Sequence, residues 1–74
     1  MGRKNKSPED YEVNRNIAAI MKSKNLSVRE VASRMNVPYD RVYKTVNCKR
    51  TVFAQELVGF SLALGVSVRE IFGI

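Results

Sequence analysis

The chain has 74 residues, a formal net charge of +6, a single cysteine and no histidine. A chain this short forms one small domain, and it buries only about 60% of the surface that its unfolded form exposes. Cys48 cannot form an internal disulfide, and without histidine neither a zinc site nor a catalytic thiol has the partners it needs. No apolar segment is long enough to cross a membrane or to act as a secretory signal, so we expect a cytoplasmic protein without metal or cofactor.

The excess of lysine and arginine favours a polyanionic partner. Cationic side chains that neutralise phosphates release the counterions bound there, and this release drives binding to nucleic acid. The same charge is compatible with a soluble cationic protein that has no such partner. Charge alone therefore leaves both interpretations open.

The N-terminal residues 1–6 carry three cations and no apolar residue beyond the initiator methionine. We expect them to form a flexible basic arm, followed by a single domain over residues 7–74. Arg3, Lys4 and Lys6 of this arm either contact the minor groove or the backbone of DNA, or only keep the protein soluble.

The first helix is expected to start at Ser7 and Pro8. Serine can accept a hydrogen bond from an uncapped N–H group, and proline suits the first helical position. Four apolar residues then recur at helical spacing: Val13, Ile17, Ile20 and Met21. The helix should end near residue 24, where Asn25 can adopt the left-handed conformation that commonly closes a helix.

The next stretch predicts two short helices joined by a tight turn. Ser27 and Glu30 form a capping box, in which the serine caps the first turn and the glutamate bonds back to it. Asn36 tolerates the positive φ of a turn, and Pro38 starts a third helix over residues 38–47. Inward-facing residues of the two helices are Val31, Ala32, Met35, Val42 and Val46.

A basic connector over residues 47–52 leads to a fourth helix at 54–64, which Gly65 should end. This helix is expected to bury Leu57, Phe60, Ser61 and Leu64. Ser67 and Glu70 repeat the capping box and open a last short helix that contains Ile71 and Phe72. Five short helices with short connections predict an all-α fold.

The sequence resembles the Cro and phage-repressor helix-turn-helix family from about Val13 to Gly73. The residues that carry the resemblance are Leu26-Ser27, Glu30-Val31-Ala32, Val37, Val42, Lys49-Arg50, and the closing segment ALGVSVREIFG at 63–73. The resemblance implies a compact five-helix, lambda-repressor-like domain with its helix-turn-helix at helices 2 and 3. Members of the family bind double-stranded DNA, usually as dimers on palindromic operators.

The chain departs from the family pattern at several positions. Val28 replaces a glutamine that commonly contacts phosphate, and Asn36 replaces the turn glycine. Thr45 occupies a place that is usually apolar. Met21 and Val46 stand where many relatives have a buried arginine–glutamate pair, so we expect apolar packing there; such an exchange is often neutral or stabilising.

The resemblance assigns base contacts to the third helix. The matching residues are Tyr39, Asp40, Arg41 and Lys44. Arg41 can bond guanine O6 and N7 together, and Lys44 can reach guanine or a phosphate. Tyr39 can contact a thymine methyl group or a phosphate. Asp40 either accepts from cytosine N4 or only favours the positive end of the helix dipole.

A second set of residues is expected to contact the sugar-phosphate backbone, which positions the protein without specifying sequence. These residues are Arg29, Tyr43, Asn47, Lys49 and Arg50. For Tyr43 the alternative is packing against the second helix. For the three connector residues the alternative is a solvated, charged loop.

Apolar residues at places where a monomer could carry polar groups are candidates for dimerisation: Phe53, Val58, Leu62 and Ile74. The sequence thus predicts a phage or bacterial Cro-like repressor that binds an operator as a homodimer. The alternative is a protein-interaction module of the same fold, such as an antitoxin-like or antirepressor component. No enzyme motif, membrane segment or small-molecule site is evident.

Overall fold

The computed structural model describes residues 11–74, which contain five α-helices and no strand. The helices are α1 (Glu12–Ser23), α2 (Val28–Met35), α3 (Tyr39–Val46), α4 (Ala54–Leu64) and α5 (Val68–Phe72). The predicted all-α fold with five helices is therefore confirmed. The arm at 1–6 and the expected helix start at Ser7 and Pro8 lie outside the described residues; α1 begins at Glu12.

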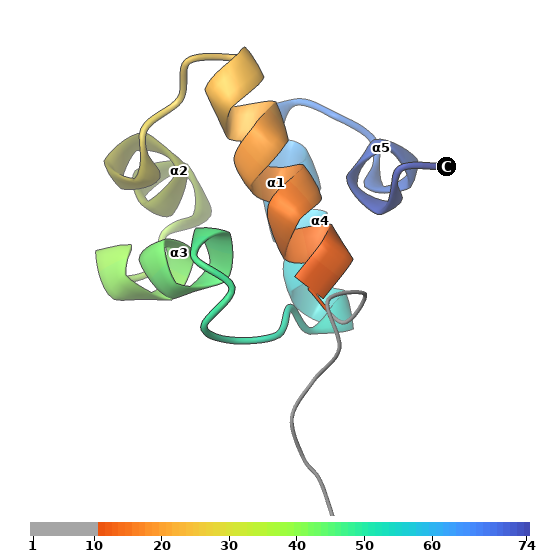
Figure 1. Ribbon diagram of the computed structural model, residues 1–74. Coiled ribbons are helices and arrows are strands. Elements are labelled where there is room, and N and C mark those ends of the chain that lie inside the picture. Colours follow the sequence, from red (N-terminus) through yellow and green to blue (C-terminus); the bar gives the residue numbers. More distant parts are fainter. Residues whose placement is uncertain (1–10) are drawn as a thin grey trace, which may run out of the picture.

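The other four helices surround α1, which lies at the centre of the molecule. Figure 1 shows α2 and α3 on one side of α1 and α5 on the other, with α4 behind it. Helix α1 contacts α3, α4 and α5, while α2 packs against both α3 and α4. The pair α2 and α3 is thus separated from α5 and the C-terminus by the central helices.

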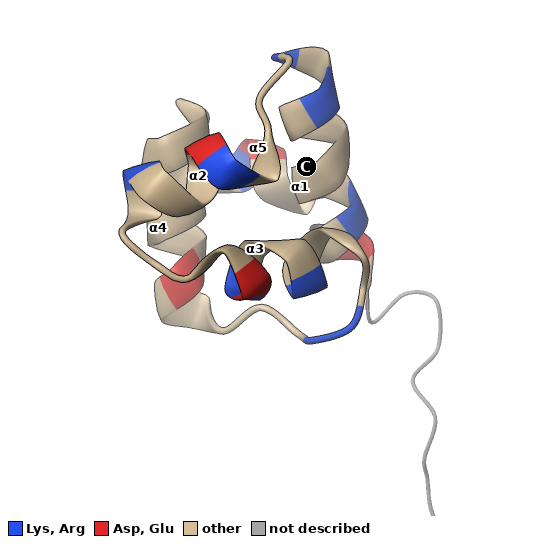
Figure 2. Ribbon diagram, turned by 90° about the vertical axis from the view of Figure 1, so that its left-hand side faces the viewer, with Lys and Arg blue, Asp and Glu red and all other residues tan. Residues whose placement is uncertain are grey.

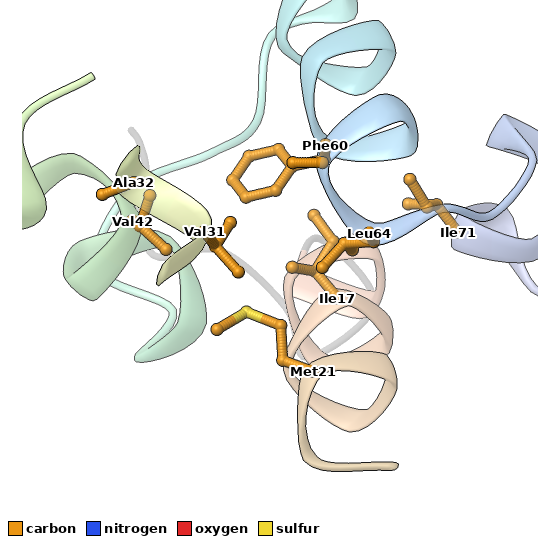
Figure 3. Close-up of a cluster of buried hydrophobic side chains, with 9 residues drawn as sticks. Ile17, Met21, Val31, Ala32, Val42, Phe60, Leu64 and Ile71 are labelled. Atoms are coloured by element: carbon orange, nitrogen blue, oxygen red, sulfur yellow. The ribbon is translucent and has the colours of Figure 1, made fainter. Parts of the chain in front are cut away.

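The core contains residues from every helix. Ile17, Val31, Val42, Phe60 and Ile71 are fully buried, and Figure 3 shows their side chains converging between the helices. Met21, Ala32, Ala63 and Leu64 complete the cluster. Other residues that we expected in the core are half-buried. Those that pack against the cluster are Val13, Ile20, Met35, Val46 and Leu57. Ser61, next to Phe60 on α4, is also half-buried. Phe72, by contrast, is 43% exposed.

Both predicted capping boxes are present. The Ser27 hydroxyl accepts from the Glu30 N–H at 3.0 Å, and the Glu30 carboxylate accepts from the Ser27 N–H at 2.9 Å. These bonds from Ser27 hold the pKa of the Glu30 carboxyl below its ordinary value, so the cap is charged at neutral pH. Ser67 and Glu70 repeat the arrangement at α5.

The ends of the five helices share one backbone motif. A residue with positive φ follows each helix, and the N–H of the next residue donates to a carbonyl five positions back, as in the Schellman motif. The residues with positive φ are Asn25, Asn36, Cys48, Gly65 and Gly73. Asparagine tolerates this conformation because of its short amide side chain, and glycine because it has no Cβ. Cys48 adopts it, with φ 58°, without either feature.

We expect Cys48→Gly to raise the free energy of unfolding by about 0.5–1 kcal/mol, because glycine removes the strain of the left-handed conformation. Cys48 is only half-buried, so little packing is lost. Urea unfolding followed by circular dichroism measures the change. Asn36→Gly is the control and should change stability less, since asparagine already tolerates this conformation. A less stable Cys48→Gly protein would contradict the assignment.

Candidate nucleic-acid interface

The turn between α2 and α3 sets the angle of the second helix. Asn36 is in the left-handed conformation with φ 58° and ψ 45°, and the Val37 N–H donates to the Ala32 carbonyl at 3.0 Å. Pro38 then caps α3 in an extended conformation instead of forming its first turn, so α3 is slightly shorter than expected. Val42 of α3 is fully buried in the core that it shares with Val31 of α2, and the opposite face of α3 is left to solvent.

The outward face of α3 brings together all four residues that we expect to contact bases. Tyr39, Asp40, Arg41 and Lys44 are exposed, as is Tyr43 beside them. Figure 2, which views the molecule from this side, shows charged residues of both signs on α3 and cations along the connector that follows it. The helix thus presents a mixed aromatic and charged surface next to a basic loop.

Two pairs at helical spacing order this face. The rings of Tyr39 and Tyr43 stack with centroids 6.1 Å apart and planes inclined by 19°. Lys44 Nζ lies 3.2 Å from Asp40 Oδ2, and both side chains are more than half exposed. An exposed pair of this kind contributes little to stability, so either partner can exchange it for a DNA group at small cost.

Arg41 differs from its neighbours on α3. Its side chain is exposed and makes no hydrogen bond or ion pair with any residue of the described chain. Its five N–H donors are therefore available to a partner outside the chain. This makes it the cation of α3 best suited to a bidentate bond.

The residues beside α3 differ in how available they are. Arg29, in the first turn of α2, and Lys49, in the connector, are exposed cations. The Asn47 amide donates to the Tyr43 carbonyl at 2.8 Å and so helps to close the last turn of α3. Val28 is half-buried against the core. This agrees with the expectation that its side chain, in place of the family's glutamine, makes no contact with phosphate.

Arg50 is held within the protein. Its Nη1 lies 3.1 Å from the Glu56 carboxylate and 3.2 Å from the Thr45 hydroxyl, and its guanidinium lies 5.7 Å from the centre of the Phe53 ring. The Arg50 side chain is only 22% exposed. Its charge is therefore balanced by Glu56, and it supports the connector from inside. The sequence pattern had not indicated this ion pair.

Asn14 and Thr45 are buried polar residues. From the sequence, Thr45 was noted only as a departure at a usually apolar place, and Asn14 was not singled out. Asn14 is 1% exposed and Thr45 is fully buried. The Asn14 amide donates to the carbonyls of Thr45 at 2.8 Å and Arg50 at 2.7 Å. Helical spacing relative to Ile17 and Met21 places Asn14 on the inward face of α1, and this spacing was the one signal in the sequence.

The four dimerisation candidates are all exposed. Their exposed fractions are 59% for Phe53, 56% for Val58, 79% for Leu62 and 82% for Ile74. Val58 and Leu62 are one turn apart on α4. Phe72 of α5 is a further exposed apolar side chain. Its position beside Ile71 in the sequence did not indicate that it would be exposed.

Other kinds of site receive no support from the part of the chain that is described. Within residues 11–74, no group of three or more His, Cys, Asp or Glu side chains could hold a metal ion. None of the helices over the same residues is long and apolar enough to span a membrane. Arg3, Lys4 and Lys6 lie outside this range.

Comparison with known proteins gives the family. The model of the Cro/C1-type HTH DNA-binding domain matches residues 16–74. The chain belongs to this family. The family is defined by DNA binding and not by a reaction, and the resemblance noted in the sequence is thereby confirmed.

A solved structure shares the fold of this Cro/C1-type domain. The restriction-modification controller protein C.AhdI from Aeromonas hydrophila superposes with a TM-score of 0.81 over 89% of this chain and 100% of that chain, at 18% sequence identity. No curated protein sequence matches the chain significantly. The family supports a DNA-binding transcription regulator, and the likeness to the solved structure shows the fold.

Proposed function

We propose that this protein is a sequence-specific repressor that binds a palindromic operator as a homodimer, with α3 in the major groove. The observation that carries the proposal is the outward face of α3, where the Arg41 side chain has no partner in the described chain and Tyr39, Asp40 and Lys44 lie beside it. A helix held on a small frame with one polar face outward can enter the major groove. A dimer bound across a promoter would block the polymerase.

Base contacts follow from the chemistry of this face. The fork of Arg41 matches the two acceptors of guanine in the major groove, O6 and N7. Asp40 either accepts from cytosine N4 or keeps its ion pair with Lys44, which is then directed at guanine or a phosphate. Tyr39 has a ring edge for a thymine methyl group and a hydroxyl for a phosphate.

Phosphate contacts flank the helix on both sides. Arg29 at the start of α2 and Lys49 in the connector are exposed cations, and the first-turn N–H groups of α2 add a partial positive charge. Asn47 and Tyr43 can add hydrogen bonds to phosphate oxygens. Arg50 contributes mainly by supporting this segment, because Glu56 already balances its charge. The arm cations Arg3, Lys4 and Lys6 would extend the contact into the minor groove or along the backbone.

Salt dependence tests the proposal. Binding of the protein to a random duplex, followed by fluorescence anisotropy between about 50 and 200 mM salt, should weaken steeply, because each neutralised phosphate releases counterions. Selection from randomised duplexes should then yield a palindromic site. If the protein does not bind duplex DNA at low salt, the proposal that this chain binds DNA is wrong.

Lys49→Ala should weaken binding to the selected operator and to random DNA by the same factor, and reduce the salt slope by about 1. The reason is that Lys49 is placed to contact phosphate, which is common to all sequences. Arg69→Ala is the matched control, because it removes one exposed cation from α5, on the far side of α1 from α3 (Figure 1). A loss confined to the operator would show that Lys49 contacts a base.

Homodimerisation is supported by the composition of α4. Two of its polar residues are bonded inside the protein, Glu56 to Arg50 and Ser61 to the Val66 carbonyl. Gln55 is exposed in the first turn, and after it the exposed positions of α4 are Val58 and Leu62. The outer side of the helix is therefore apolar beyond its first turn, and an apolar helix face is usually covered by another element. A second copy would cover the outer face and place two recognition helices on one operator.

One observation favours the alternative, a module that binds another protein. An open pocket of about 540 Å³ between α2 and α4 is lined by Arg34, Met35, Gly59, Leu62 and Ala63. Such a surface could receive an apolar side chain of a partner. This alternative predicts no salt-dependent binding to DNA, so the salt titration separates the two functions.

A further inference from the structure

A partly buried polar network ties α3 to the two helices behind it. Its members are Asn14 of α1, Thr45 of α3, Arg50 of the connector and Glu56 of α4, and we call this group the anchor. The Asn14 amide bonds the Thr45 carbonyl at 2.8 Å and the Arg50 carbonyl at 2.7 Å. The Arg50 guanidinium closes the network by bonding the Thr45 hydroxyl at 3.2 Å and the Glu56 carboxylate at 3.1 Å.

The anchor acts on the segment that carries the candidate phosphate contacts. Between Asn47 and Thr51 no side chain is part of the apolar core or packs against it, and the next residue that does so is Val52. The path of this segment therefore depends on polar bonds to the frame. Asn14 holds its backbone, while Glu56 holds the Arg50 side chain and also accepts from the Phe53 N–H at 2.9 Å.

The anchor also acts on α3 itself. The Thr45 carbonyl lies in the last turn of α3, and the Thr45 hydroxyl donates to the Arg41 carbonyl at 2.8 Å. Asn14 thus bonds α3 and the connector through one amide group. The two bonds fix how far the connector lies from the outward face of α3, on which Arg41 stands.

We propose that Asn14, through the anchor, is a positioning residue that sets the distance between the base contacts of α3 and the phosphate contacts of the connector. The proposal rests on the DNA-binding function proposed above. A bidentate bond from Arg41 tolerates little displacement, whereas a lysine on a flexible stem reaches phosphate from many positions. Loosening the anchor should therefore weaken operator binding more than random binding.

Asn14→Leu tests this, because leucine is similar in size and lacks both N–H donors. At a temperature where the protein is folded by circular dichroism, we expect operator affinity to fall about tenfold and random-duplex affinity to change less than about twofold. Hydrogen exchange at the amides of residues 48–51 should become faster, while that of α5 should stay as in wild type. Glu56→Gln is the second variant, used if Asn14→Leu does not fold, and it should change the affinities in the same direction.

Ile71→Val is the matched control, since it destabilises the fold from α5 without touching the anchor. It should leave the ratio of operator to random affinity unchanged. If Asn14→Leu lowers both affinities by one factor, or if Ile71→Val lowers the ratio equally, the positioning role is overturned. If wild type itself fails to bind duplex DNA, the proposed function fails instead, so the two failures are distinguishable.

Discussion

Arg41→Ala is expected to lower affinity for the operator by about 1–3 kcal/mol and to relax preference at one base position. The guanidinium of Arg41 is exposed on α3 and has no partner within residues 11–74, so removing it leaves the protein intact and one base pair without its contact. Competition binding with operators mutated at single positions measures both effects. The preferred base at one symmetric pair of positions should lose its advantage.

Arg41→Lys separates the geometry of this contact from its charge. Lysine keeps the positive charge but lacks the planar fork, so random-duplex binding should stay near wild type while preference at that base position weakens. An equal loss on every sequence for Arg41→Ala, with full rescue by lysine, would show that Arg41 contacts phosphate.

Leu62→Lys is expected to give a monomer and to lower operator affinity by about 100-fold or more, because binding to the second half-site is no longer intramolecular. Leu62 is 79% exposed on the outer side of α4, so a charged residue there disturbs no packing within one protomer. Sedimentation equilibrium gives the mass, and titration of full and half operators gives the affinities. Half-site affinity should remain as in wild type.

Ala19→Lys is the matched control for Leu62→Lys, since it adds the same charge at an exposed position of α1. It should leave the mass and the operator affinity unchanged. A wild-type protein that is monomeric and binds the full operator with the same affinity as the half operator would contradict the dimer.

The limits of α2, α4 and α5 were predictable because each depends on neighbours in the chain. Ser27 and Ser67 cap their helices with a glutamate three residues later, and α4 runs from Ala54 to Leu64 as periodicity indicated. Asn25 and Asn36 end their helices at positive φ for a reason that lies in their own side chains. Cys48 does the same without such a signal, because hydrogen bonds of the last turn of α3 impose the conformation.

The composition of the outward face of α3 was likewise visible in the sequence. Once α3 was placed by its buried Val42, helical spacing determined that Arg41 and Lys44 lie on the other side. The stacking of Tyr39 on Tyr43 and the pairing of Asp40 with Lys44 follow from the same spacing. The role of Arg50 could not be predicted from this spacing, because Arg50 lies in the connector and its partner Glu56 lies on α4.

What the sequence by itself determined, then, is the set of helices, their caps and the residues that α3 turns outward, all of which depend on contacts within a few positions. The anchor was decided only by the tertiary structure. Asn14 bonds carbonyls that are 31 and 36 residues away, and those atoms meet only after α1, α3 and the connector have packed. A buried amide satisfies its donors wherever the packed chain brings a carbonyl within reach, and no local pattern specifies which one that is.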